Sequence, residues 1–315
     1  MYFQTSGVEL SPWVPPLVAF GISFFTSMGG VSGAFLLLPF QVSILGYTAP
    51  SVSATTQLYN IVAIPGGVRR YCKEGRMLWP LTWIIAAGTL PGVFLGAFAR
   101  VAYLPDPENF KLFAGCVLLY TGGRLIRGLL SKTSGSANDA AGENPFQDII
   151  KAVSPEKPGD KATAAVEVTH FNLRRLGYTF YGEQFDVSFW GIFTLSFIVG
   201  IIGGIYGIGG GAIIAPFLVA FFGLPVHTIA GATLLGTFLT SIAGVASYLA
   251  IAPFYPGISV GPDWLLGLLF GLGGMAGIYL GARCQKHVPA NTLKWALAAV
   301  ITFTALKYLT AFWGL

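Results

Sequence analysis

Two glycine-rich stretches carry the strongest chemical signal of this 315-residue sequence. Each interrupts an apolar segment, and a proline follows each of them, Pro39 after the first and Pro216 after the second. We expect both prolines to act as structural helix breaks, because proline lacks an N–H and clashes with the preceding turn. A helix that restarts after such an interruption presents free N–H groups and the positive end of its dipole, which attract an anion. Glycine also lets the backbone approach a ligand closely, because it has no Cβ. The residues that we expect to contact an anion in this way are Gly29, Gly30, Ser32 and Gly33 in the first stretch, and Gly207, Gly209, Gly210 and Gly211 in the second.

Polar side chains follow each glycine-rich stretch, in the next apolar segment. The candidates for ligand contact are Thr56, Gln57 and Asn60 in the first half and Thr233 and Thr237 in the second. Thr56 and Asn60 are four residues apart, as are Thr233 and Thr237, so each pair shares one helix face. Gln57 and Asn60 are costly in lipid, and we expect both in the protein interior. A threonine hydroxyl can instead bond to a carbonyl of its own helix, and this alternative stays open for each threonine.

Arg69 and Arg70 stand at the end of the same apolar segment and are alternative ligands for an anion. Basic residues at the end of a span also fix its orientation in the membrane. We favour this second role for the two arginines.

The glycines have two further interpretations. Residues Gly207–Ala212 fit the loose dinucleotide-binding pattern, but no acidic residue follows about 20 residues later. Small residues also let membrane helices pack closely without binding a ligand. Close packing is the role that we favour for Gly92, Gly96, Gly277 and Gly281.

The composition is that of a membrane protein. Hydrophobic residues make up 54% of the chain and charged residues only 10%, whereas soluble domains carry about 25% charged residues. This excludes a soluble enzyme and a disordered chain. It also excludes a nucleic-acid-binding protein, because the charges behind the net charge of +5 are few and dispersed. Three cysteines at unrelated spacings predict no disulfide framework and no metal site, and no cofactor is expected.

Apolar segments long enough to cross a bilayer fill most of the chain. A transmembrane helix needs about 20 apolar residues, and six segments meet that length: 51–69, 78–100, 108–130, 228–252, 263–285 and 291–312. Two more, 13–46 and 188–223, are apolar but interrupted by the glycine-rich stretches. Broken backbone at membrane depth survives only where protein buries it or where it lines a cavity. Each interrupted segment either crosses the membrane in two pieces or re-enters as a hairpin.

The chain contains an internal repeat. A shift of 177 residues superimposes the two interrupted segments without gaps. The matched pairs include Gly30 with Gly207, Pro39 with Pro216, Thr56 with Thr233, Asn60 with Thr237 and Tyr71 with Tyr248. We therefore predict two transmembrane repeats, residues 1–130 and 187–315. Between them, residues 131–186 hold 14 of the 31 charged residues and are expected to form a soluble loop.

Basic residues near span ends indicate that the two repeats are inverted. Arg69, Arg70, Lys73 and Arg76 place the connection after residues 51–69 in the cytoplasm. The equivalent connection of the second half, 253–263, has no basic residue, whereas 283–294 has three. The fold class that we predict is an all-α polytopic membrane protein with two inverted-topology repeats of about five helical segments each. The first segments of each repeat are broken or re-entrant, and the central loop is cytoplasmic.

These motifs resemble a known family. The run from Gly207 to Pro216, followed by Gly223, is similar to the signature of the TauE/SafE sulfite exporter family, and Gly30 to Pro39 is a degenerate copy in which Ser32 replaces a glycine. The resemblance covers both apolar blocks. It implies transport of small sulfur-containing anions such as sulfite, thiosulfate, sulfoacetate or other organosulfonates.

Inverted repeats with interrupted helices are typical of secondary transporters that bind substrate near the midplane. We therefore expect a multi-pass transporter of the cell membrane, working by alternating access, with the lipid bilayer and a small sulfur anion as its partners. An anion channel with a fixed pore through the same site is the alternative. The oligomeric state is open, with a homodimer among the alternatives.

Overall fold

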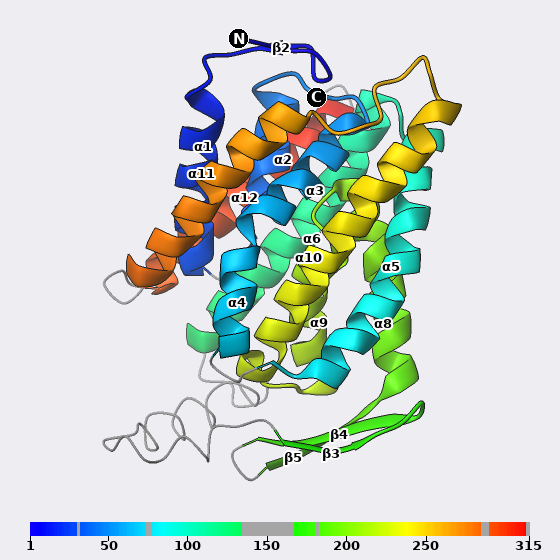
Figure 1. Cartoon of the computed structure of the whole chain (residues 1–315). Helices are drawn as coiled ribbons and strands as arrows, with labels where there is room; N and C mark the ends of the chain where they lie inside the picture. The colour runs from blue at the N-terminus through cyan, green and yellow to red at the C-terminus, as the bar shows by residue number, and fades with distance from the viewer. Residues whose placement is uncertain (30–31, 74–76, 134–166, 181–182, 285–289, 313–315) are drawn as a thin grey trace.

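The computed structural model describes residues 1–29, 32–73, 77–133, 167–180, 183–284 and 290–312, and the chain is mostly helical (Figure 1). The helices of the first half are α1 (Val14–Gly29), α2 (Ala34–Ser43), α3 (Ser51–Ala63), α4 (Pro65–Lys73), α5 (Trp79–Ala102) and α6 (Pro107–Thr133). Those of the second half are α8 (Phe189–Tyr206), α9 (Gly210–Phe222), α10 (Val226–Ile251), the short η1 (Ala252–Phe254), α11 (Trp264–Cys284) and α12 (Ala290–Phe312).

Six of the described helices are long and apolar enough to cross a membrane, namely α5, α6, α8, α10, α11 and α12. Five of them confirm predicted spans, which began and ended within a few residues of the helices. The predicted single span 51–69 is wrong in one respect, because the helix is interrupted at Ile64 and continues as α4 from Pro65. Proline has no N–H to bond back to the preceding turn, and its ring clashes with that turn.

The helices define two ends of the bundle. The N-terminal end holds residues 1–13, 44–50 and 252–263, which hydrogen bonds of Ser6, Ser51 and Ser259 tie together (top of Figure 1). It also carries the two short paired strands β1 (Tyr2–Phe3) and β2 (Val8–Glu9). The sheet end, opposite, holds α4 and a three-stranded sheet. Helix α1 begins at the N-terminal end and α2 returns to it. Helix α8 begins at the sheet end and α9 returns to that end.

The sheet is antiparallel, in the order β3 (Glu167–Phe171), β4 (Arg175–Phe180), β5 (Glu183–Ser188). The predicted all-α fold did not include it. Leu176 and Tyr178 of β4 are buried, and the Tyr178 hydroxyl bonds to Thr228 Oγ1 of α10 at 3.0 Å. Because β5 runs directly into α8, the sheet fixes where that helix starts.

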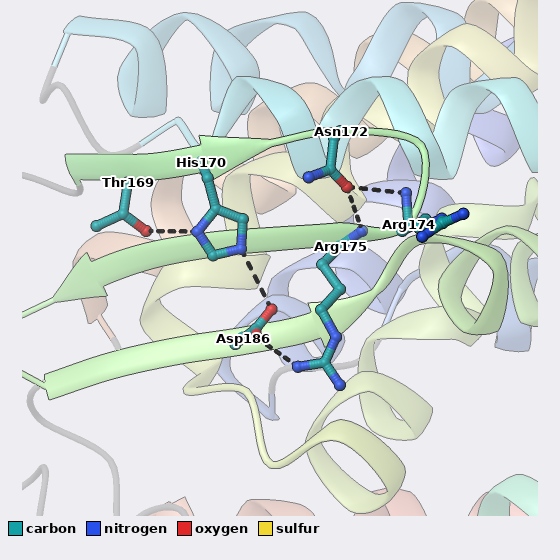
Figure 2. Close-up of polar contacts among 6 residues, drawn as sticks. All are labelled: Thr169, His170, Asn172, Arg174, Arg175 and Asp186. Carbon is teal, nitrogen blue, oxygen red and sulfur yellow. Dashed lines mark hydrogen bonds and ion pairs between the residues drawn. The ribbon is translucent and has the colours of Figure 1, made fainter.

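The exposed polar face of the sheet carries an ion-pair cluster (Figure 2). Arg175 Nη1 bonds to Asp186 Oδ2 at 2.5 Å, and His170 Nε2 lies 3.4 Å from Asp186 Oδ1. The hydrogen bond from Arg175 lowers the pKa of the Asp186 carboxyl. At the turn between β3 and β4, Asn172 Oδ1 accepts the N–H groups of Arg174 and Arg175. The cluster therefore links one side chain from each of the three strands.

Glycines bring two helix pairs into close contact. Helix α5 packs along α8, and α11 packs along α1. A Cβ at Gly92 or Gly96 would overlap backbone carbonyls of α8, and one at Gly277 or Gly281 would overlap α1. The close-packing role that we favoured for these four glycines is confirmed.

Gly96→Val should separate α5 from α8, because its side chain has no space beside the Ile201 carbonyl. Overpacking of this kind costs about 1–3 kcal/mol. The matched control is Gly123→Val on α6, where an added Cβ has open space. The melting temperature of the purified protein in detergent should fall clearly for Gly96→Val and only slightly for Gly123→Val. Equal losses would mean that this contact does not stabilise the bundle.

Candidate functional site

The connection between α8 and α9 is a tight turn that only glycine accommodates; we call residues 207–209 the glycine turn. Gly207 has φ 90° and Gly209 has φ 80°, both in the left-handed region. A Cβ on Gly207 would lie 2.5 Å from the carbonyl oxygen of Ser53. The glycine turn therefore lies directly against α3.

Three side chains hold the backbone around the glycine turn. Ser53 Oγ donates to the Ile205 carbonyl at 2.8 Å, and Tyr248 donates to the Gly204 carbonyl at 2.9 Å. Asn60 Nδ2 donates to the Ile208 carbonyl at 2.7 Å. An unpaired carbonyl in an apolar interior costs several kcal/mol, so these bonds allow the chain to turn inside the bundle.

Asn60 is buried, and its amide has a defined orientation. A carbonyl oxygen only accepts, so the atom that faces Ile208 must be the amide nitrogen. The same nitrogen lies 3.3 Å from Ser241 Oγ of α10. Asn60 Oδ1 has no partner among the described residues. It is an acceptor beside the glycine turn that a ligand could use.

Gln57 lies three residues before Asn60 and is fully buried. Neither its amide nitrogen nor its amide oxygen has a partner within the described parts of the chain. Its amide packs against Gly244 of α10, where a Cβ would overlap it. Gln57 therefore offers an NH2 group with two N–H donors and an acceptor oxygen between α3 and α10.

Gln41 of α2 is a polar residue of the site that the sequence analysis missed. Its Nε2 donates to Thr56 Oγ1 at 2.9 Å, and its Oε1 is buried without a partner in the described structure. Thr56 in turn donates to the Val52 carbonyl of its own helix. A glutamine two residues after Pro39, inside an apolar segment, is the signal that could have found it.

Thr233 and Thr237 donate to carbonyls of their own helix, at 3.2 and 2.8 Å. Both hydroxyls therefore bond to a carbonyl of their own helix, which is the alternative to ligand contact that the sequence analysis left open. Their helix still borders the start of α9, because a Cβ on Gly209 or Gly211 would meet Thr237. Gly210 lies instead against Thr89 of α5. The second glycine stretch is thus enclosed by α3, α5 and α10.

The first glycine stretch lies in a different environment. Gly29 ends α1, Gly30 falls outside the described residues, and Ser32 Oγ accepts the N–H of Ala34 at 3.4 Å. Gly33 packs beneath the Tyr59 hydroxyl, which bonds to Ser23 Oγ at 2.8 Å. None of the described contacts joins this stretch to Gln57 or Asn60.

The expectation that the two prolines break their helices is wrong, because Pro39 stands inside α2 and Pro216 inside α9. The Phe35 carbonyl, four residues before Pro39, accepts from the Tyr206 hydroxyl at 3.1 Å in place of the missing N–H. The carbonyls of both prolines also accept side-chain hydrogen bonds. Pro39 accepts from the Tyr308 hydroxyl at 3.4 Å, and Pro216 accepts from Arg124 Nη2. Arg69 is exposed on α4, at the sheet end. Arg70 belongs to the same helix, but its side chain lies outside the described residues.

The N-terminal end is closed by hydrogen bonds between the two halves. Ser51 N donates to the Ser259 carbonyl at 3.0 Å, and the two serine hydroxyls bond at 2.9 Å. Asp263 N donates to Thr55 Oγ1 at 2.9 Å, and the Asp263 carboxylate accepts from Ser6. The start of α3 is therefore fixed to the connection between α10 and α11.

The comparisons with known proteins agree on a membrane transporter. The family profile described as Sulfite exporter TauE/SafE matches residues 16–308. The probable membrane transporter protein YunE of Bacillus subtilis is 27% identical over 269 residues, covering 82% of this chain and 92% of YunE. The probable membrane transporter protein YdhB of the same organism is 29% identical over 118 residues, covering 38% of this chain and 45% of YdhB. No solved structure matches the chain.

Asn60→Ala and Gln57→Leu should have opposite effects on the ligand-free protein. Asn60→Ala leaves the buried Ile208 carbonyl unpaired, which costs about 1–3 kcal/mol. Gln57→Leu keeps the volume and removes two unpaired polar atoms, so stability should be unchanged or higher. Thermal unfolding in ligand-free detergent solution measures both. A much lower melting temperature for Gln57→Leu would show that the Gln57 amide has a structural partner.

Proposed function

The chain belongs to the TauE/SafE sulfite exporter family, and from this premise we propose that it carries small sulfur-containing anions across the membrane that it spans. The observation that supports a substrate site is the set of buried amide atoms of Gln57 and Asn60 that have no partner among the described residues. Both residues belong to α3, the helix that packs against the glycine turn. Such atoms are costly in a closed interior, and a bound ligand would satisfy them. The site contains neutral groups rather than buried charges.

The chemistry of these atoms narrows the substrate class. Gln57 offers an N–H donor, whereas Gln57 Oε1 and Asn60 Oδ1 are acceptors. An anion that carries its own O–H or N–H satisfies both kinds of group. Hydrogensulfite has such a donor. Taurine also has one, because at neutral pH it is a zwitterion with an ammonium group beside its anionic sulfonate. Thiosulfate and sulfoacetate present acceptors only at neutral pH. Substrates with a donor should therefore bind more tightly.

The two halves act as inverted repeats. Support comes from the reciprocal packing of their helices: α5 of the first half packs on α8 of the second, and α11 of the second packs on α1 of the first. In the sequence register of the repeat, α5 corresponds to α11 and α1 to α8. The hairpin α1–α2 starts from the N-terminal end and α8–α9 from the sheet end, as inversion requires (Figure 1).

The sheet end faces the cytoplasm in this proposal. Arg69, Lys73 and Arg283 stand at that end of their helices, and cytoplasmic connections are enriched in basic residues. The segment 131–186, which contains the sheet up to Asp186 of β5, then forms the cytoplasmic unit between the two transmembrane repeats 1–130 and 187–315. The membrane is the cell membrane.

A ligand screen tests the substrate class. Hydrogensulfite and taurine should raise the melting temperature of the purified protein more than thiosulfate and sulfoacetate do, and acetate and chloride should not raise it. Gln57→Leu should lose these shifts while it keeps its fold. If acetate or chloride stabilises the protein as much as any sulfur anion, the substrate class is wrong.

A disulfide across the closed end tests alternating access against a fixed pore. Ser51→Cys with Ser259→Cys, in a background with Cys72, Cys116 and Cys284 replaced by serine, places two thiols where the hydroxyls bond at 2.9 Å. Oxidation should stop anion flux into proteoliposomes, and a reductant should restore it. The single-cysteine variants are the controls. Unchanged flux through the cross-linked protein supports a fixed pore.

A further inference from the structure

Arg100, near the end of α5, is a fully buried cation close to the N-terminal end. Its Nη2 donates to the Thr48 carbonyl at 2.9 Å, and its Nη1 donates to the Leu104 carbonyl. The guanidinium carbon lies 3.8 Å from the centroid of the Phe110 ring. These contacts hold the side chain in one orientation.

The charge of Arg100 has no counterion among the described residues. None of the ion pairs found there includes it, and its Nε is buried without a hydrogen-bond partner. Carbonyl dipoles and an aromatic face compensate a buried guanidinium only in part, because they carry no net negative charge. The Nε–H is therefore a charged donor whose partner is missing from the described structure.

Arg100 lies on the N-terminal side of the glycine turn. Tyr248 packs in one buried cluster with Ala97 and Val101, which flank Arg100 on α5. Tyr47 directly precedes Thr48, whose carbonyl accepts from Arg100. Tyr248 donates to the Gly204 carbonyl at the end of α8, and Tyr47 bonds to Thr55 Oγ1 at 3.1 Å. Tyr248 thus connects the surroundings of Arg100 with the backbone beside the glycine turn.

We propose that Arg100 is a second anion-binding site on the substrate path between the N-terminal end and the glycine turn. The proposal rests on the proposed function. Its ligand is a small oxyanion, because the N–H groups of the guanidinium fork match oxyanion oxygens. An anion reaches Arg100 when the contacts of Ser51 with Ser259 open, and it then moves on to the neutral donors at Gln57.

This site explains how a neutral binding site can attract an anion from one face of the membrane. A desolvated cation raises the local concentration of anions more than an exposed one, since water and salt screen an exposed charge. Arg69, which the sequence analysis considered for this role, is exposed at the opposite end. Arg100 is the buried alternative.

Taurine and hydrogensulfite binding to Arg100 variants tests the inference. Arg100→Gln should weaken their affinity on the order of 10- to 100-fold, which is the usual effect of losing a hydrogen bond to a charged group. Arg100→Lys keeps the positive charge, and its affinity for both ligands should fall less. The matched control is Arg124→Gln, which removes another arginine that donates to a carbonyl and lies over a phenylalanine ring; its affinity should stay at the wild-type value.

The outcomes separate the two proposals. If wild-type protein binds neither ion, the proposed function fails. If wild type binds but folded Arg100→Gln binds equally well, Arg100 has a structural role only and the inference is overturned. Should Arg100→Gln fail to fold, Arg100→Lys decides: weaker binding by a stable protein supports the site, and unchanged affinity overturns it.

Discussion

The arrangement of this bundle depends on how the backbone at the end of α8 satisfies its hydrogen bonds. The carbonyls of Gly204, Ile205 and Ile208 lie in the protein interior, where water cannot replace a missing donor. Tyr248, Ser53 and Asn60 supply the three donors. Because two of these side chains come from α3 and one from α10, the turn that ends α8 also joins the two halves of the chain. The same requirement places amide groups in the interior, where a ligand can use them.

The two halves share a glycine pattern but have different polar groups around it. Asn60 of the first half corresponds to Thr237 in the repeat, and Gln57 corresponds to Leu234. Thr237 bonds to its own helix, whereas Asn60 reaches across to the opposite half. The first half therefore supplies the side chains and the second half supplies the glycine turn. In our account this asymmetry leaves a single substrate site, on α3, instead of one in each half.

The sequence predicts the helices and the buried amides well, because apolar length and the cost of polar groups in lipid are local properties. Gln57 and Asn60 are buried as expected. The packing partners that decide function are not local: neither Gln41 beside Thr56 nor Arg100 over Phe110 follows from spacing along the chain. Arg100 stands at the end of an apolar segment, and its burial does not follow from that position. The sheet β3–β5 was also missed, since its short strands lie in a charged segment and become ordered by packing Tyr178 against α10.

The central claim is that neutral groups on α3 and at the glycine turn hold the substrate anion. An experimental structure determined with bound taurine tests it most directly. Our account predicts density for the ligand in contact with the Gln57 amide and Asn60 Oδ1, beside Gly209. A structure with no density at Gln57 or Asn60, in which taurine lies instead at exposed Arg69, would contradict the account.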